Sequence, residues 1–332
     1  MSSSGTNPAR GYSYKEAFLA SLSHSIAAPT AAWPTVRLWT KTSLDRMFQR
    51  VKDEVGESKP PQSNLELIHW MEKLGLASAI EVDGEVFYLL EIGAGPKSEI
   101  DPMELLMAYE PLGVVCYFSA IAFHSLTSQM PSHHHVAVIT ESSRMGDAKE
   151  AERDNTEVEL CRETIAKKVG NYKKTRRKAN PLGKVLFSFL DVPYYLTRRT
   201  KRLVPGVQNR SNGPRGQFRI TTYEQTLLDT LYKPQNCGGP AVVLEAWQEA
   251  VASGRLDEQR LVGYLAQMDY PSTTRRLGTM LQLMEYKPGD ELGSYLDRAK
   301  RSINKEAPHL QISLLPGFDY SNLDEGWLVR LP

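Results

Sequence analysis

Two adjacent signals between residues 63 and 90 limit most strongly what this chain can fold into. Ser63 is followed three residues later by Glu66, the spacing of a capping box at a helix start. Gly75 stands where such a helix would end. Two runs rich in β-forming residues, 79–82 and 85–90, flank Asp83-Gly84, a strong hairpin signal. The stretch therefore predicts a helix followed by a β-hairpin. The helix would turn five apolar side chains inward: Leu65, Leu67, Ile68, Met71 and Leu74.

The residues before this helix extend the pattern. A helix is predicted over 14–26, a short strand over 36–39, and a second helix from Thr42 or Ser43 to Val55. The order helix, strand, helix, helix, hairpin is that of a winged helix-turn-helix, whose last helix enters the major groove of DNA. We therefore expect a DNA-binding domain over 13–92, after a disordered N-terminus over 1–12.

Candidate DNA contacts follow from this assignment. Phosphate contacts need cations or hydrogen-bond donors, and base contacts come from the groove helix. The candidates are Lys41, Thr42, Arg46, Arg50, Ser63, Asn64, His69 and Lys73. The groove helix is only weakly basic, because Glu66 and Glu72 accompany Lys73. Winged helices also act as protein-docking modules, so that alternative stays open.

The remainder, residues 100–332, reads as strands followed by helices, which is an α+β pattern. Strands are expected over 134–140, 185–190, 194–197 and 218–221, and an apolar run over 112–126 is expected to be one buried helix. The segment 209–216 is predicted to be a loop. Five helices are predicted over 223–232, 240–253, 257–268, 272–285 and 291–304.

Charge is balanced overall and uneven locally. The net charge of +1 gives no bulk attraction to polyanions. A charged insertion is predicted over 148–180, acidic in its first half and basic in its second. With a later pair of arginines it forms a candidate secondary basic patch: Lys167, Lys168, Lys173, Lys174, Arg176, Arg177, Lys178, Arg198 and Arg199. A nucleic-acid contact, an acidic partner and an ordinary solvated face all fit this composition.

Composition excludes several classes of protein. The chain has 332 residues, which favours about two domains, and 3 cysteines that are far apart, which argues against a disulfide framework and a zinc site. The N-terminus lacks the apolar core of a signal peptide, and the most apolar run is too short to span a bilayer. We therefore expect a soluble cytoplasmic protein that does not bind membranes.

Catalytic motifs are missing from the sequence. His133 and His135 could share a metal ion on one strand face, but no carboxylate or thiol accompanies them at ligand spacing, and a polar strand start is the simpler interpretation. His124 fits a hydrogen-bonded core histidine. Asp191 and Glu224 lack the partner that a nuclease site needs. We expect no cofactor, no metal and no enzymatic activity.

The second half resembles a known family. The motifs are the TLLD run, Thr226 to Asp229; Gly238-Gly239 after Pro234; and RRLG, Arg275 to Gly278. Together with YFSAIAFHSLTSQ before a strand, they are similar to the AbiEi antitoxins of type IV toxin–antitoxin systems. The candidate antitoxin residues are Thr226, Asp229, Gly238, Gly239, Arg275 and Arg276. Without the resemblance, Arg275 and Arg276 read as one solvated arginine and one buried ion pair with a carboxylate such as Asp229.

The resemblance implies two roles. The winged helix would bind repeats in double-stranded DNA of its own promoter and repress the operon. The second domain would oppose a nucleotidyltransferase toxin without forming a stable complex with it. A nucleic-acid hydrolase guided by the winged helix and a non-catalytic scaffold remain as alternatives.

Overall fold

The computed structural model describes residues 15–20, 37–55, 63–90, 100–141, 182–212, 215–303, 311–318 and 320–331. The chain divides into two compact units. The first unit comprises residues 1–113, 187–189 and 209–218, and the second comprises 114–186, 190–208 and 219–332. The first unit thus continues past the boundary predicted between residues 92 and 100. The N-terminus predicted to be disordered lies outside the described residues.

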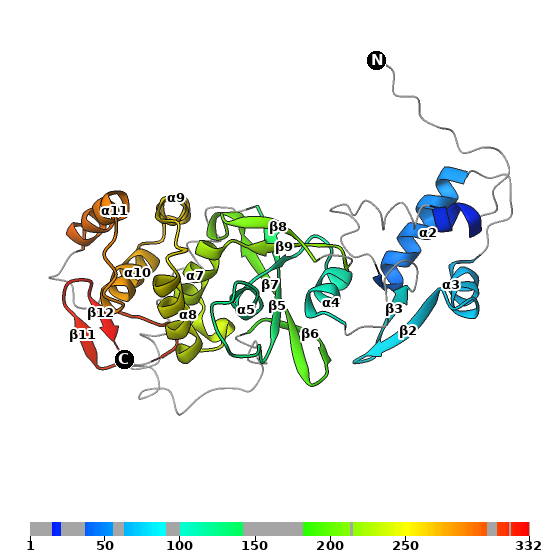
Figure 1. Ribbon diagram of the computed structural model, residues 1–332, viewed down its shortest axis with the longest axis horizontal. Helices are drawn as coiled ribbons and strands as arrows, with labels where there is room; N and C mark the ends of the chain where they lie inside the picture. Colours follow the sequence, from blue (N-terminus) through cyan, green and yellow to red (C-terminus); the bar gives the residue numbers. More distant parts are fainter. Residues whose placement is uncertain are drawn as a thin grey trace, which may run out of the picture. The chain divides into compact units, whose positions relative to one another are not determined.

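The first unit combines a small sheet with helices (Figure 1). Its elements are β1 (Leu38–Thr40), α2 (Lys41–Val55), α3 (Asn64–Lys73), β2 (Ala77–Val82), β3 (Glu85–Leu90) and α4 (Pro102–Tyr109). The sheet has the order β1-β3-β2, and β3 pairs antiparallel with both neighbours. Tyr88 in the middle strand lies opposite Trp39 on one side and Ala79 on the other.

The core of the first unit uses most of the predicted apolar positions. Four side chains of α2 are buried as their spacing predicts: Leu44, Met47, Phe48 and Val51. Residues 15–20 are helical, and the Phe18 ring packs 4.5 Å from that of Phe48. On α3, Leu67, Ile68 and Met71 are buried, but Leu65 is 69% exposed, and Leu74, which directly follows the helix, is 57% exposed. The prediction that these two leucines face inward is wrong, because the core contacts a stripe of α3 too narrow to include them.

A six-stranded mixed sheet follows, with β4 (Val114–Val115), β5 (His134–Thr140), β6 (Lys184–Phe189), β7 (Val192–Thr200), β8 (Val207–Ser211) and β9 (Gln217–Thr221). The strand order is β6-β7-β5-β4-β9-β8. β5 is parallel to β7 and antiparallel to β4, and β4 is parallel to β9. The sheet therefore joins strands that are far apart in the sequence.

Two predictions fail in this sheet. The run 112–126 is not one helix, because Val114-Val115 forms β4 and only Phe118–Phe123 forms a helix, α5. Val114 and Val115 are β-branched and pair as a strand with β5 and β9. Tyr117 then adopts a positive φ of 56°, which ends the extended segment before the helix begins. The predicted loop 209–216 is strand in its first part, since β8 continues to Ser211.

The C-terminal part is a helical block, as predicted. It contains α7 (Tyr223–Tyr232), α8 (Pro240–Ser253), α9 (Glu258–Met268), α10 (Pro271–Leu283) and α11 (Asp290–Arg301), with short 3₁₀ turns at Lys201–Leu203 and Pro234–Cys237. A small sheet of order β10-β12-β11 closes the chain, from Ile312–Ser313, Val329–Leu331 and Asn322–Asp324. The fold is therefore mixed α/β with a C-terminal helical block.

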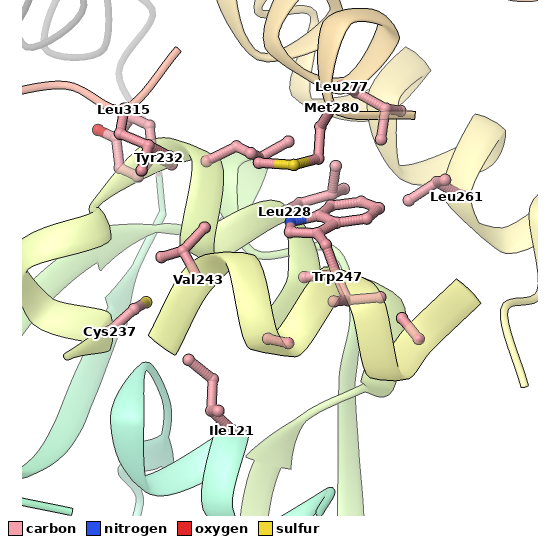
Figure 2. Close-up of a cluster of buried hydrophobic side chains, with 14 of the residues drawn as sticks. Ile121, Leu228, Tyr232, Cys237, Val243, Trp247, Leu261, Leu277, Met280 and Leu315 are labelled. Carbon is pink, nitrogen blue, oxygen red and sulfur yellow. The ribbon is translucent and has the colours of Figure 1, made fainter. Parts of the chain in front are cut away.

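The core of the second unit forms around α8 (Figure 2). Trp247 is fully buried among Leu228, Leu261 and Met280, which come from three other helices. Its indole N–H donates to Thr230 Oγ1 at 2.9 Å, so the one polar group of the ring is satisfied. No helix among the described residues has the length and apolar character needed to cross a membrane.

Candidate nucleic-acid interface

The outward face of α3 holds acidic and basic side chains together. Successive residues of a helix are turned by about 100°, so the side opposite Leu67, Ile68 and Met71 presents a different set of side chains. Leu65, Glu66, His69, Glu72 and Lys73 are exposed on this side, and His69 Nδ1 lies 4.0 Å from Glu72 Oε2. Leu65 and His69 are four residues apart, so they lie next to each other on this face. Of the predicted DNA contacts, His69 and Lys73 are therefore accessible.

Glu66 and Ser63 are engaged in holding the start of α3. Ser63 Oγ accepts from the Glu66 backbone N–H at 3.2 Å, and Glu66 Oε2 accepts from the Ser63 N–H at 3.0 Å. The predicted capping box is thus confirmed. The hydrogen bond fixes the direction of the Glu66 carboxylate, which keeps its negative charge on the exposed side of the helix. Ser63, predicted to contact DNA, has a role in the helix cap.

A polar network joins α2 to the start of α3. Asn64 Nδ2 donates to Asp45 Oδ1 at 3.0 Å, and Asn64 Oδ1 accepts from Lys52 Nζ at 2.7 Å. Lys41 Nζ donates to the other oxygen of Asp45 at 2.8 Å. Asn64, predicted to contact DNA, therefore uses both ends of its amide within the protein. The hydrogen bond to Asp45 raises the pKa of Lys41.

The remaining candidates on α2 are on its surface. Thr42, Arg46 and Arg50 are exposed. They lie on the side of α2 away from the core, which is contacted by Leu44, Met47, Phe48 and Val51. The two arginines are four residues apart and so share one side of the helix. This side of α2 can place guanidinium groups against phosphates.

The hairpin after α3 is acidic. Glu81, Asp83 and Glu85 are exposed at and beside its turn. Asp83 Oδ2 accepts from the backbone N–H of Ser188 at 3.0 Å, within the same unit. Carboxylates repel phosphates, so this hairpin is poorly suited to the backbone contact that the winged-helix assignment predicts for it.

The first unit contains a buried ion pair that the sequence did not predict. Arg37 Nε and Nη2 donate to the two oxygens of Glu104 at 2.7 and 2.9 Å, and both side chains are nearly inaccessible. Glu104 Oε2 also accepts from the Asp101 N–H at 3.1 Å, in a second capping box. The pair ties the segment before β1 to α4. No local pattern marks Glu104 as the partner of Arg37, because the two residues are 67 positions apart in the sequence.

His133, which precedes β5, and His134 and His135, which begin it, are buried among protein groups. His133 Nε2 donates to Asn236 O and His135 Nε2 to Leu182 O, each at 2.9 Å. The two rings lie on one strand face, with centroids 4.9 Å apart. Burial lowers the pKa of His133, and lowers that of His135 to about 3. Both are neutral imidazoles bonded to backbone carbonyls. The described residues hold no group of three or more His, Cys, Asp or Glu side chains placed to bind a metal.

His124 is buried as expected, with Nε2 donating to Thr221 O at 2.8 Å.

Arg199 is not part of a surface patch, which corrects the sequence prediction. Its guanidinium donates to both oxygens of Asp229 at 2.6 Å, and the side chains are 3% and 0% exposed. Gln225 Nε2 donates to Asp229 Oδ1 at 2.8 Å. β7 alternates its side chains, so Arg198 is exposed while Arg199 points into the core. The other patch candidates, Lys167 to Lys178, lie outside the described residues.

The RRLG motif holds the C-terminal strands. Arg275 donates to the carbonyls of Trp327 at 2.8 Å and Leu328 at 2.6 Å, and Arg276 donates to that of Ser313 at 3.0 Å. The expected ion pair of one arginine with Asp229 is wrong, because Arg199 occupies that carboxylate. Gly278 leaves room for Trp327, since a Cβ there would overlap the indole ring.

The other motif residues also have intramolecular contacts. Thr226 is buried, and its hydroxyl donates to Thr222 O at 2.8 Å. Gly238 and Gly239 have φ of 88° and 87°, which favour glycine, and a Cβ on Gly238 would meet Val242 and Phe118. The motif therefore describes how the helical block packs, and its buried members are out of a partner's reach. Comparison with protein-family models gives no match, and neither does comparison with curated proteins.

Proposed function

We propose that residues 38–90 form a winged helix that binds double-stranded DNA, with α3 in the major groove. The observation that carries the proposal is the outward face of α3. Leu65, His69 and Lys73 are exposed there, with Glu72 beside His69 and the Glu66 carboxylate bonded to the Ser63 N–H. The strand order β1-β3-β2 and the succession β1, α2, α3, β2, β3 agree with the winged-helix arrangement.

The phosphate contacts come in this proposal from α2. Arg46 and Arg50 are exposed on one side of that helix, and phosphate contacts set position and affinity while base contacts set specificity. The acidic hairpin, with Glu81 and Glu85 exposed, is left out of the interface. Binding therefore depends on α2 and α3 more than in a winged helix with a basic wing.

The physiological role rests on the resemblance to AbiEi antitoxins. In this proposal the chain acts in the cytoplasm, binds repeats in its own promoter and represses transcription. It also opposes a nucleotidyltransferase toxin without a stable complex. The second unit would carry this second role, with the TLLD, GG and RRLG residues maintaining its packing.

The DNA-binding proposal is tested by fluorescence anisotropy with the full chain. The probe is duplex DNA from directly upstream of its own coding region, with a shuffled duplex for comparison, at about 50 to 200 mM salt. We expect preference for the upstream duplex and a steep loss of affinity with salt. Arg46→Gln with Arg50→Gln lowers the slope of log K against log salt by about 2, one for each lost phosphate contact.

Arg298→Gln is the matched control, an exposed arginine on α11, and leaves the slope unchanged. Equal affinity of the wild type for both duplexes contradicts sequence-specific binding.

The antitoxin role is tested by co-expression with a nucleotidyltransferase encoded beside this chain. We expect the full chain to restore growth, and the Arg46→Gln, Arg50→Gln variant to restore it too, because repression and toxin opposition use different units. Growth arrest that persists with the wild type present contradicts the antitoxin role.

A further inference from the structure

Leu65 is a large apolar side chain whose exposure to water does not stabilise the folded protein. It is the second residue of α3 and 69% exposed, although its apolar character placed it in the predicted core. A single exposed leucine is common on protein surfaces. Leu65, however, lies in the first turn of the helix that we propose enters the major groove, and His69 follows on the same face.

The polar groups around Leu65 are already used within the protein. On one side in sequence, Asn64 bonds Asp45 and Lys52. On the other, Glu66 bonds the Ser63 N–H. Asn64 and Glu66 are each turned by about 100° from Leu65 along the helix and bond within the protein, so the first turn of α3 presents Leu65 to the groove as an apolar side chain. Such a surface suits an apolar group of the DNA.

The major groove offers one such group on its base edges, the C5-methyl of thymine. We infer that Leu65 recognises a thymine methyl group in the major groove and so sets part of the sequence preference; this inference rests on the proposed DNA-binding function. Removing a buried methyl loses about 0.8 kcal/mol, which corresponds to about a fourfold change in affinity.

The test uses the full chain and a high-affinity duplex selected by it from a random-sequence library. Each thymine of the selected site is replaced in turn by deoxyuridine, which removes only the methyl group. We expect wild-type affinity to fall about fourfold when one particular thymine of the selected site is replaced. Leu65→Ala binds the thymine and uracil duplexes equally at that position, while Leu65→Met keeps the discrimination.

Leu74→Ala is the matched control, because Leu74 is also exposed, at 57%, but follows the last residue of α3. It keeps the wild-type ratio of affinities. All three variants retain the wild-type melting temperature, because neither Leu65 nor Leu74 is in the core.

The outcomes separate the two proposals. If Leu65→Ala keeps the wild-type thymine-to-uracil ratio at every position, the inference is overturned and DNA binding stands. If the wild type selects no duplex from the library, the proposed function and the inference both fall.

Discussion

Gly278 shows how a single side chain, or its absence, joins distant parts of the second unit. The helix α10 approaches the C-terminal strands so closely that the indole of Trp327 fills the space where a side chain on residue 278 would be. The ring also lies under Lys300, whose Nζ is 5.2 Å from its centroid. Trp327 is 4% exposed, so it has little freedom to move away.

Gly278→Ala is therefore expected to destabilise the protein despite the higher helix propensity of alanine. The added methyl forces the indole aside, at a cost of about 1–3 kcal/mol in the free energy of unfolding. Urea denaturation measures the difference. Gly263→Ala on α9 is the control, because a Cβ there meets no atom within 4 Å, and a gain of about 0.5–1 kcal/mol is expected. Equal effects at both glycines would contradict this account.

Glu245 predicts a pH dependence of stability. Its carboxylate accepts from the Ser128 N–H at 2.7 Å and from Thr127 Oγ1 at 2.6 Å, and these hydrogen bonds lower its pKa from 4.5 to about 2. A lowered carboxyl pKa contributes stability above the unfolded value, which is lost as the pH falls through the folded value. The stability difference between wild type and Glu245→Gln is thus constant above about pH 5 and disappears towards pH 2.

Urea unfolding of the two proteins across this range measures that difference. Glu249→Gln, at an exposed position on the same helix, is the control. A difference that stays constant down to pH 2 would show that the Glu245 hydrogen bonds do not depend on its charge.

At the scale of elements, α3 depends on its capping box more than on its length. The helix has 10 residues, which is short for a helix that must stand alone, and its first turn is held by Ser63 and Glu66. The same cap positions the side chains proposed to contact DNA. Stability and binding at this helix are therefore coupled through Ser63.

Ser63→Ala is expected to lower the free energy of unfolding by about 0.5–2 kcal/mol, because an N–H at the helix start loses its acceptor. Ser63→Asp keeps an acceptor and so keeps the stability. Thermal unfolding measures the stability of both variants, and fluorescence anisotropy measures the affinity of Ser63→Asp for DNA. If Ser63 only caps the helix, Ser63→Asp reduces affinity slightly. A loss of more than about tenfold, equivalent to 1.4 kcal/mol, would mean that its side chain contacts a phosphate.

At the scale of the whole molecule, the position of the domain boundary after the hairpin determines which fragments are stable. The winged-helix assignment ends a domain at residue 92, but Glu104 lies beyond that point and pairs with buried Arg37. A fragment that ends at residue 92 loses the Arg37–Glu104 ion pair and the packing of α4 beside β1. Small domains are only marginally stable, so the loss of these contacts is expected to lower the melting temperature.

We therefore expect the fragment 1–92 to melt at a lower temperature than the fragment 1–113, as followed by circular dichroism. Arg37→Met in the shorter fragment removes the unpaired charge and recovers part of the loss. Identical melting of the two unsubstituted fragments would show that the ion pair adds no net stability.

The sequence alone predicted the features that depend on neighbours within one or two turns. The capping box at Ser63, the Asp83-Gly84 hairpin and the five C-terminal helices lie where periodicity and caps placed them. Hydrogen bonds of helices and tight turns join residues a few positions apart, so a short stretch of sequence is enough to predict them.

Only the tertiary structure decided which side chains are buried and with what they pair. Val114-Val115 became a strand because β5 and β9 flank it, and Leu65 is exposed because the core of the first unit does not extend to it. Arg199 finds Asp229 30 residues away, and Arg275 finds Trp327 52 residues away. Burial and ion pairing depend on which distant elements pack together. The residues next to a position in the sequence therefore do not predict its tertiary contacts.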